Sequence, residues 1–60
     1  MKKLFWKTYQ VEFVNTQNTK RQVQFFRGFP WEVIKMAVEE AKEKSEKEKE
    51  PWAVNDIKRI

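Results

Sequence analysis

Apolar and polar residues alternate along the first part of the chain. Within residues 3–15, odd positions such as Tyr9, Val11 and Phe13 are apolar, and the even positions 8, 10 and 12 between them are polar, which is the period of a half-buried β-strand. A polar loop at 15–19 follows, and a second strand is predicted at 20–29. We expect a hairpin whose register places Val11 opposite Val23 and Tyr9 opposite Phe25, because these four apolar residues then share one face.

A helix is predicted at residues 30–47. Gly28 accepts backbone angles closed to other residues, and Pro30 suits the first turn of a helix, where the missing N–H costs nothing. The 3.6-residue period then predicts one stripe that covers the sheet, with Met36 pointing nearly the opposite way. The stripe consists of Trp31, Ile34, Ala37, Val38 and Ala41, and Val33 flanks it.

The last segment, 52–60, is rich enough in β-branched residues for a third strand. Val54 and Ile57 can share a face of that strand only if a bulge lies at Asn55 and Asp56. A right-handed crossover through the helix places this strand beside the first. The sequence therefore predicts an α+β fold of ββαβ form: a three-stranded antiparallel sheet in the order 2-1-3, with one helix packed on one face.

The composition fits one small domain over residues 1–60. The chain holds neither Cys nor His, which excludes disulfides and ordinary zinc sites. The apolar run after Lys2 and Lys3 ends at Lys7, too early for a signal peptide, and no run reaches membrane-spanning length. We expect a cytoplasmic protein without a membrane segment.

The sequence offers little for catalysis. Without His or Cys, and with its one Ser inside a run of charges, it provides no nucleophile paired with a base. Its single Gly excludes a glycine-rich phosphate loop, and the glutamates of the helix alternate with lysines in the manner of a solvated surface. We predict no enzyme, no cofactor, no metal and no small-molecule substrate.

The uncovered face of the sheet is the candidate site. Even positions of the first two strands are expected to point away from the helix, with Trp6 and Phe26 as diagonal neighbours. The predicted binding residues are Leu4, Trp6, Thr8, Gln10, Gln24 and Phe26. A basic rim is predicted from Lys2, Lys20, Arg27, Lys58 and Arg59, because the net charge of +4 resides on the strands while the helix is mildly acidic.

Three uses of this face stay open. Exposed aromatic residues serve as anchors in protein interfaces or dimers. They also stack on unpaired nucleic-acid bases beside basic side chains. Alternatively, Trp6 and Phe26 only cover each other.

The layout resembles that of small bacteriophage and prophage proteins of ββαβ form. The resemblance is carried by the aromatic first strand at 3–13, the polar hairpin, the Ala- and Glu-rich helix and the closing segment 52–60. One such group binds and inhibits host enzymes, including RNA polymerase, and the resemblance implies no functional residue. The predicted function is a non-enzymatic binding module that contacts a protein partner, either a host factor or a second copy. Single-stranded nucleic-acid binding is the alternative.

Overall fold

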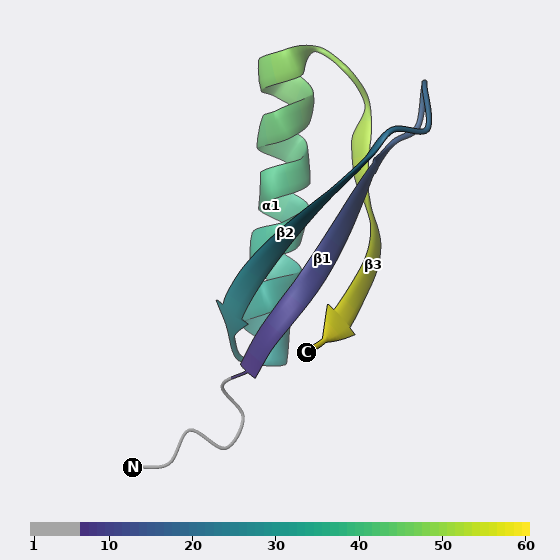
Figure 1. Cartoon of the computed structure of the whole chain (residues 1–60). Helices are drawn as coiled ribbons and strands as arrows, with labels where there is room; N and C mark the ends of the chain where they lie inside the picture. Colours follow the sequence, from purple (N-terminus) through teal and green to yellow (C-terminus); the bar gives the residue numbers. More distant parts are fainter. Residues whose placement is uncertain (1–6) are drawn as a thin grey trace.

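The structure, a computed structural model, describes residues 7–60 as one sheet and one helix (Figure 1). The elements are β1 (Lys7–Asn15), β2 (Arg21–Gly28), α1 (Pro30–Glu48) and β3 (Trp52–Arg59). The strands lie in the order β2-β1-β3, and both pairings are antiparallel. The predicted ββαβ fold and strand order are confirmed.

Local chemistry sets both ends of α1. Gly28 has φ +152°, a backbone conformation that side-chain-bearing residues rarely adopt. Pro30 occupies the first helical position, and the Glu32 carboxylate accepts a hydrogen bond from the Phe29 N–H at 3.3 Å. Lys49 ends the helix in the left-handed conformation, and its N–H donates to the Ser45 carbonyl.

The register of the hairpin differs from the prediction by one residue. Val11 lies opposite Gln24 and Tyr9 lies opposite Phe26. The loop decides this register: the Asn15 N–H donates to the Lys20 carbonyl at 2.8 Å, which leaves four residues in the loop where the prediction had five. Because side chains alternate with period two, this slip exchanges the two faces of β2.

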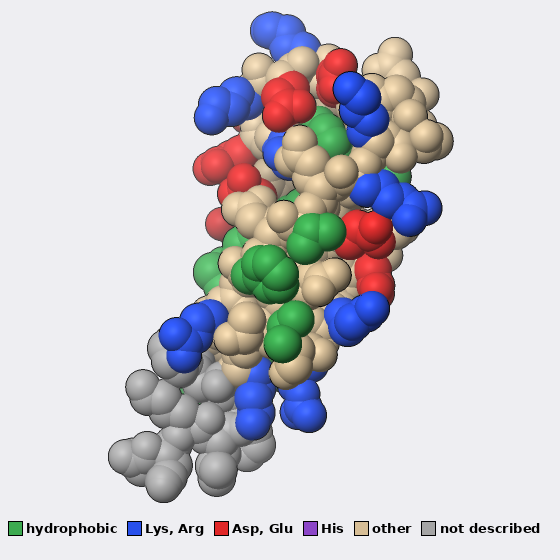
Figure 2. Space-filling model, in the orientation of Figure 1, with side chains coloured by type: hydrophobic (Ala, Val, Ile, Leu, Met, Phe, Trp, Pro, Cys, Tyr) green, Lys and Arg blue, Asp and Glu red, His purple; other side chains and the backbone are tan. Residues whose placement is uncertain are grey.

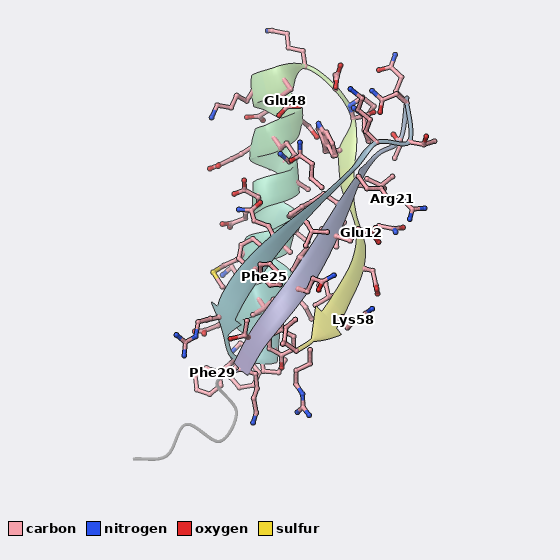
Figure 3. All side chains as sticks on the ribbon, in the orientation of Figure 1. Glu12, Arg21, Phe25, Phe29, Glu48 and Lys58 are labelled. Carbon is pink, nitrogen blue, oxygen red and sulfur yellow. The ribbon has the colours of Figure 1, made fainter. Side chains whose placement is uncertain are left out.

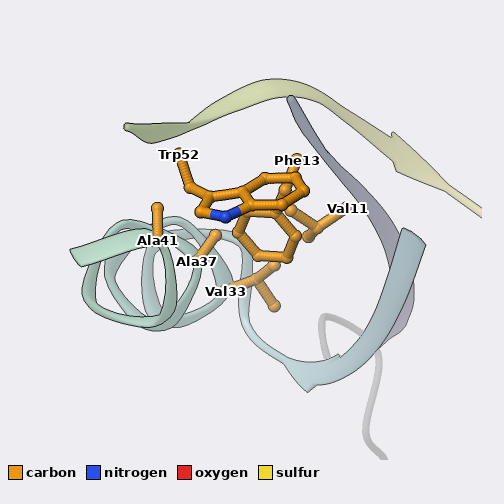
Figure 4. Packing of buried hydrophobic residues seen from close by; sticks show 6 residues of the cluster. All are labelled: Val11, Phe13, Val33, Ala37, Ala41 and Trp52. Atoms are coloured by element: carbon orange, nitrogen blue, oxygen red, sulfur yellow. The ribbon is translucent and has the colours of Figure 1, made fainter. Parts of the chain in front are cut away.

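The helix is also rotated from its predicted orientation. Val33 and Ala37 are completely buried and Ala41 nearly so, whereas Trp31, Ile34 and Val38 are exposed. Figure 4 shows the reason: the large rings of Phe13 and Trp52 from the sheet fill the core. Small side chains on the facing side of α1 let the helix approach these rings at close-packed density.

The bulge predicted in the last strand is present. Asp56 lies opposite Glu12 and Val54 lies opposite Phe13, so Asn55 is the extra residue of β3. The bulge brings both Val54 and Ile57 onto the helix side, where they pack against the buried core. The helix therefore covers one face of the sheet, and no part of residues 7–60 covers the other (Figure 1).

Candidate binding surface on the open face

The face turned away from α1, here called the open face, is built by alternate residues of three strands. Cross-strand partners in an antiparallel sheet share a face, so the register of the strands assigns each row. One row joins Phe25, Gln10 and Lys58, and the next joins Val23, Glu12 and Asp56. Arg27 with Thr8, and Arg21 with Val14 and Ala53, form the outer rows.

Two apolar side chains occupy this face on β2. Phe25 is 61% exposed and Val23 is 50% exposed, two residues apart on one strand. Figure 2 shows hydrophobic side chains at the centre of this face, with charged groups around them, and Figure 3 places Phe25 there. Such exposure of an aromatic ring beside a β-branched residue is a common feature of binding surfaces.

Charges border this apolar centre unevenly. Glu12 forms an ion pair with Arg21 at 3.5 Å and accepts a hydrogen bond from the Asn55 amide at 3.0 Å. These contacts fix the Glu12 carboxylate on the β3 side of Val23. Arg27 follows Phe25 on the open face of β2, and Lys58 lies in the row of Phe25 on the far side of Gln10; both are exposed. The cations therefore lie at both ends of the apolar centre, and the carboxylates lie along one side.

The predicted binding residues divide between the two faces. Thr8 and Gln10 lie on the open face and are half-buried. The positions predicted for Gln24 and Phe26 are wrong: both lie on the helix side, opposite Val11 and Tyr9. The one-residue slip in the register is the cause. Leu4 and Trp6 lie outside the described residues.

Phe26 is part of the packing that joins β2 to the rest of the fold. Its ring meets the buried Phe13 ring edge-on, with centroids 6.5 Å apart and an interplanar angle of 68°. Gln24, in contrast, is exposed although it shares the face of buried Val11, because α1 does not extend over this part of β2. Figure 1 shows β2 running diagonally away from the helix toward the hairpin loop.

The predicted basic rim is spread over the fold. Arg27 and Lys58 lie on the open face, and Lys20 lies in the exposed loop that precedes β2. Arg59 lies opposite Tyr9, on the helix side of β3. Lys2 is outside the described residues. Two members of the rim thus border the candidate surface, and Arg21 joins them.

Sequence reasoning missed Phe25 and Val23 because it placed them inside. One signal could have found them: Phe25 and Phe26 are adjacent, so one of the two rings has to point away from the helix in any strand. A four-residue loop closed by Asn15 and Lys20 selects Phe25 as that ring.

A second apolar area lies on α1. The Phe29 and Trp31 rings stack with centroids 4.8 Å apart and planes 3° from parallel. Trp31 is 65% exposed, and Ile34 and Val38 continue the same side of the helix. Lysines at positions 35 and 42 follow this stripe on the solvent side.

Other candidate sites carry little chemistry. An open depression of about 220 Å³ lies between β2 and α1, lined by Phe26, Met36, Glu39, Glu40 and Glu43. Within residues 7–60, no group of three or more Asp or Glu side chains is arranged to hold a metal ion. The one helix of this part of the chain is not apolar enough to cross a membrane.

Comparison with known proteins gave no match: no family model, no curated protein and no solved structure matches the chain.

Proposed function

We propose that this chain is a non-enzymatic binding module that contacts a protein partner through the open face of its sheet. The observation that carries the proposal is the exposure of Phe25 and Val23 side by side, on a face that no part of residues 7–60 covers. Binding hot spots are enriched in aromatic side chains at the centre of a patch, with polar groups around them that exclude water. The open face has this arrangement.

The border of the patch defines the chemistry of the partner. Arg27 follows Phe25 on β2, Lys58 ends the row of Phe25 on β3, and Arg21 lies at the other end of β2. A partner surface with an apolar anchor and nearby carboxylates complements both the patch and these cations. A host protein, as the phage-type layout suggests, is the first class of partner to test.

Two acidic groups favour a protein over a nucleic acid. Glu12 and Asp56 lie in the row of Val23, directly beside the apolar centre. A phosphate backbone crossing the sheet along the row of Val23 would meet these carboxylates, and like charges repel. A protein surface can place its own cations or amides there.

Site-specific photocrosslinking tests the proposal. A benzophenone amino acid at position 25 should link the chain in cells to a discrete protein, and the same probe at position 38 on α1 should not. The purified partner should then bind the unmodified chain, with a loss of about 30-fold or more for Phe25→Ala, as expected when a hot-spot aromatic is truncated.

A matched control separates binding from folding. Val38→Ala truncates a side chain that is as exposed as Val23 but lies on α1, so it should leave partner affinity unchanged within about twofold. The proposal fails if Phe25→Ala binds the purified partner as tightly as the unmodified chain does, while both keep the same circular dichroism spectrum.

Single-stranded nucleic-acid binding is the second candidate, and the row of Phe25, Gln10 and Lys58 favours it. A ring that stacks on a base, an amide that can meet a base edge and a cation for phosphate stand side by side across the sheet. Retention on single-stranded DNA or RNA that falls steeply with salt would support this candidate. An apolar protein contact is far less sensitive to salt.

A further inference from the structure

One edge of β2 has no neighbouring strand among residues 7–60, and this free edge is separate from the open face. Within residues 7–60, the order β2-β1-β3 leaves one side of β2 and one side of β3 without a neighbouring strand. Residues 22–25 of β2 are exposed, including Gln22 and Gln24 on the helix side. No other described strand pairs with this edge.

The two edges of the sheet differ in their protection against pairing. The β3 edge carries the bulge at Asn55 and the charged residues Asp56, Lys58 and Arg59, which are the devices that proteins use to prevent strand addition. β2 has an unbroken register from Arg21 to Gly28, no proline, and charges only near its ends. One edge is protected and the other is left able to pair.

The odd residues of β2 turn their backbone groups away from β1, as the hydrogen bonds of the hairpin indicate. The Asn15 N–H donates to the Lys20 carbonyl across the hairpin. On the β3 side, the Ile60 N–H donates to the Thr8 carbonyl, and the N–H of Thr16, just after β1, donates to the Pro51 carbonyl. Since bonded and non-bonded positions alternate in antiparallel pairs, even residues of β2 turn their backbone groups toward β1. Val23 and Phe25 turn theirs toward the free edge.

The sequence of this edge is symmetric in side-chain type about Gln24, except that Gln22 stands against Phe26. It reads Arg-Gln-Val-Gln-Phe-Phe-Arg from position 21 to 27. In an antiparallel pair of two copies centred on Gln24, Val23 of each copy meets Phe25 of the other, and both contribute outward backbone groups. Gln24 then lies opposite its own counterpart. The apolar residues of the open face therefore match apolar residues, and all seven positions are paired.

We propose that two copies of this chain associate through antiparallel pairing of their β2 edges, centred on Gln24, to form one six-stranded sheet. A two-fold axis perpendicular to the sheet keeps both helices on one side and both open faces on the other. Val23 and Phe25 of the two copies then form one continuous apolar surface. That this doubled surface receives the partner rests on the proposed function, whereas the pairing itself does not.

Charge repulsion at the ends of the paired segment opposes dimer formation. Arg21 of each copy lies opposite Arg27 of the other, and like charges opposite each other destabilise a strand pair. The ion pair of Arg21 with Glu12 reduces this repulsion. Added salt screens the remainder, so the dimer should strengthen with salt, in contrast to a complex with nucleic acid.

Cysteine crosslinking tests the pairing and its centre, because the natural chain has no Cys. Two residues facing each other in a non-bonded antiparallel pair have Cα atoms about 4.5 Å apart, within reach of a disulfide. Gln24→Cys should oxidise to a covalent dimer at least about tenfold faster than Val23→Cys, Phe25→Cys or Val38→Cys, as a gain in effective concentration predicts. Fastest crosslinking at 23, 25 or 38 would overturn the proposal.

Proline substitution tests the free edge without crosslinking. Val23→Pro removes an N–H that points away from β1, so it should preserve the fold and abolish the dimer, whereas Gln24→Pro should disrupt the β1–β2 ladder and unfold the chain. Sedimentation equilibrium from the low micromolar to the millimolar range should show the unmodified chain doubling in mass and Val23→Pro remaining monomeric. A folded Val23→Pro chain that still dimerises would overturn the proposal.

The two proposals fail in different ways. An unmodified chain that stays monomeric throughout that range, yet loses its protein partner on Phe25→Ala, would overturn the pairing and leave the binding function intact. A dimer that forms as described, with partner affinity unaffected by Phe25→Ala, would overturn the binding function and leave the pairing intact.

Discussion

The side-chain amide of Asn15 donates a hydrogen bond of 2.7 Å to the carboxylate of Glu50. Asn15 is completely buried at the end of β1, and Glu50 lies in the turn between α1 and β3. The Asn15 side-chain oxygen also accepts from the N–H groups of Gln17 and Asn18, at 2.9 and 3.3 Å. One buried polar side chain thus shapes the hairpin loop and ties it to the end of the helix.

Asn15→Asp should destabilise the fold by about 2–3 kcal/mol, because it replaces a donor to a charged group with a second carboxylate. The oxygen that accepts from the loop is retained, so the loss reports on the contact with Glu50. Urea unfolding followed by circular dichroism measures it. The double variant Asn15→Asp with Glu50→Gln restores a donor and should recover most of the loss; no recovery would contradict the assigned contact.

Ser45 connects the helix to β3, so its small side chain should contribute measurably to the free energy of unfolding. Its hydroxyl donates to the Ala41 carbonyl at 2.8 Å and accepts from the Trp52 N–H at 2.9 Å. Ser45→Ala leaves that N–H without its acceptor, at an expected cost of about 1–3 kcal/mol in unfolding free energy. Thr16→Ala, which removes an exposed hydroxyl bond to Pro51, is the control and should cost less than about 1 kcal/mol. Equal losses would argue against this role for Ser45.

Val33 and Val38 provide a direct test of how the helix is rotated. Val33 is completely buried against the sheet, whereas Val38 is 55% exposed. Val33→Ala should lower the unfolding free energy by about 2 kcal/mol, from lost burial and the cavity left behind. Val38→Ala should change it by less than about 0.5 kcal/mol. If Val38→Ala lowered the urea midpoint more than Val33→Ala did, the helix would instead face the sheet with the stripe predicted from the sequence, which contains Val38.

Gly28→Ala should destabilise the junction between β2 and α1. The backbone there has φ +152°, and an added Cβ would lie 3.1 Å from the Glu32 carboxylate oxygen that accepts from Phe29. We expect a loss of about 1–3 kcal/mol from backbone strain, with a further contribution from displacing Glu32. Repeating the substitution in a Glu32→Ala background separates the two. If the loss vanishes in that background, strain at Gly28 is not its cause.

The sequence alone determined the order of elements and the topology of the sheet. Gly28 and Pro30 mark the junction between the second strand and the helix. The alternation within 3–15 and the length of the helical segment then leave few possible arrangements of a ββαβ fold. Even the bulge could be inferred, because Val54 and Ile57 cannot both reach the core without it. These features depend on local backbone chemistry and on the spacing of apolar residues, and both can be read from a single sequence.

Only the tertiary structure decided which side of β2 and of α1 faces the core. Phe25 and Phe26 are chemically alike, and α1 offers two apolar stripes, so the hydrophobic pattern fits both choices in each element. The loop closed by Asn15 and Lys20 sets the register, and the rings of Phe13 and Trp52 select the small side chains of Val33, Ala37 and Ala41. Face selection depends on how volumes from distant segments fit together, and pattern along one chain carries no such information.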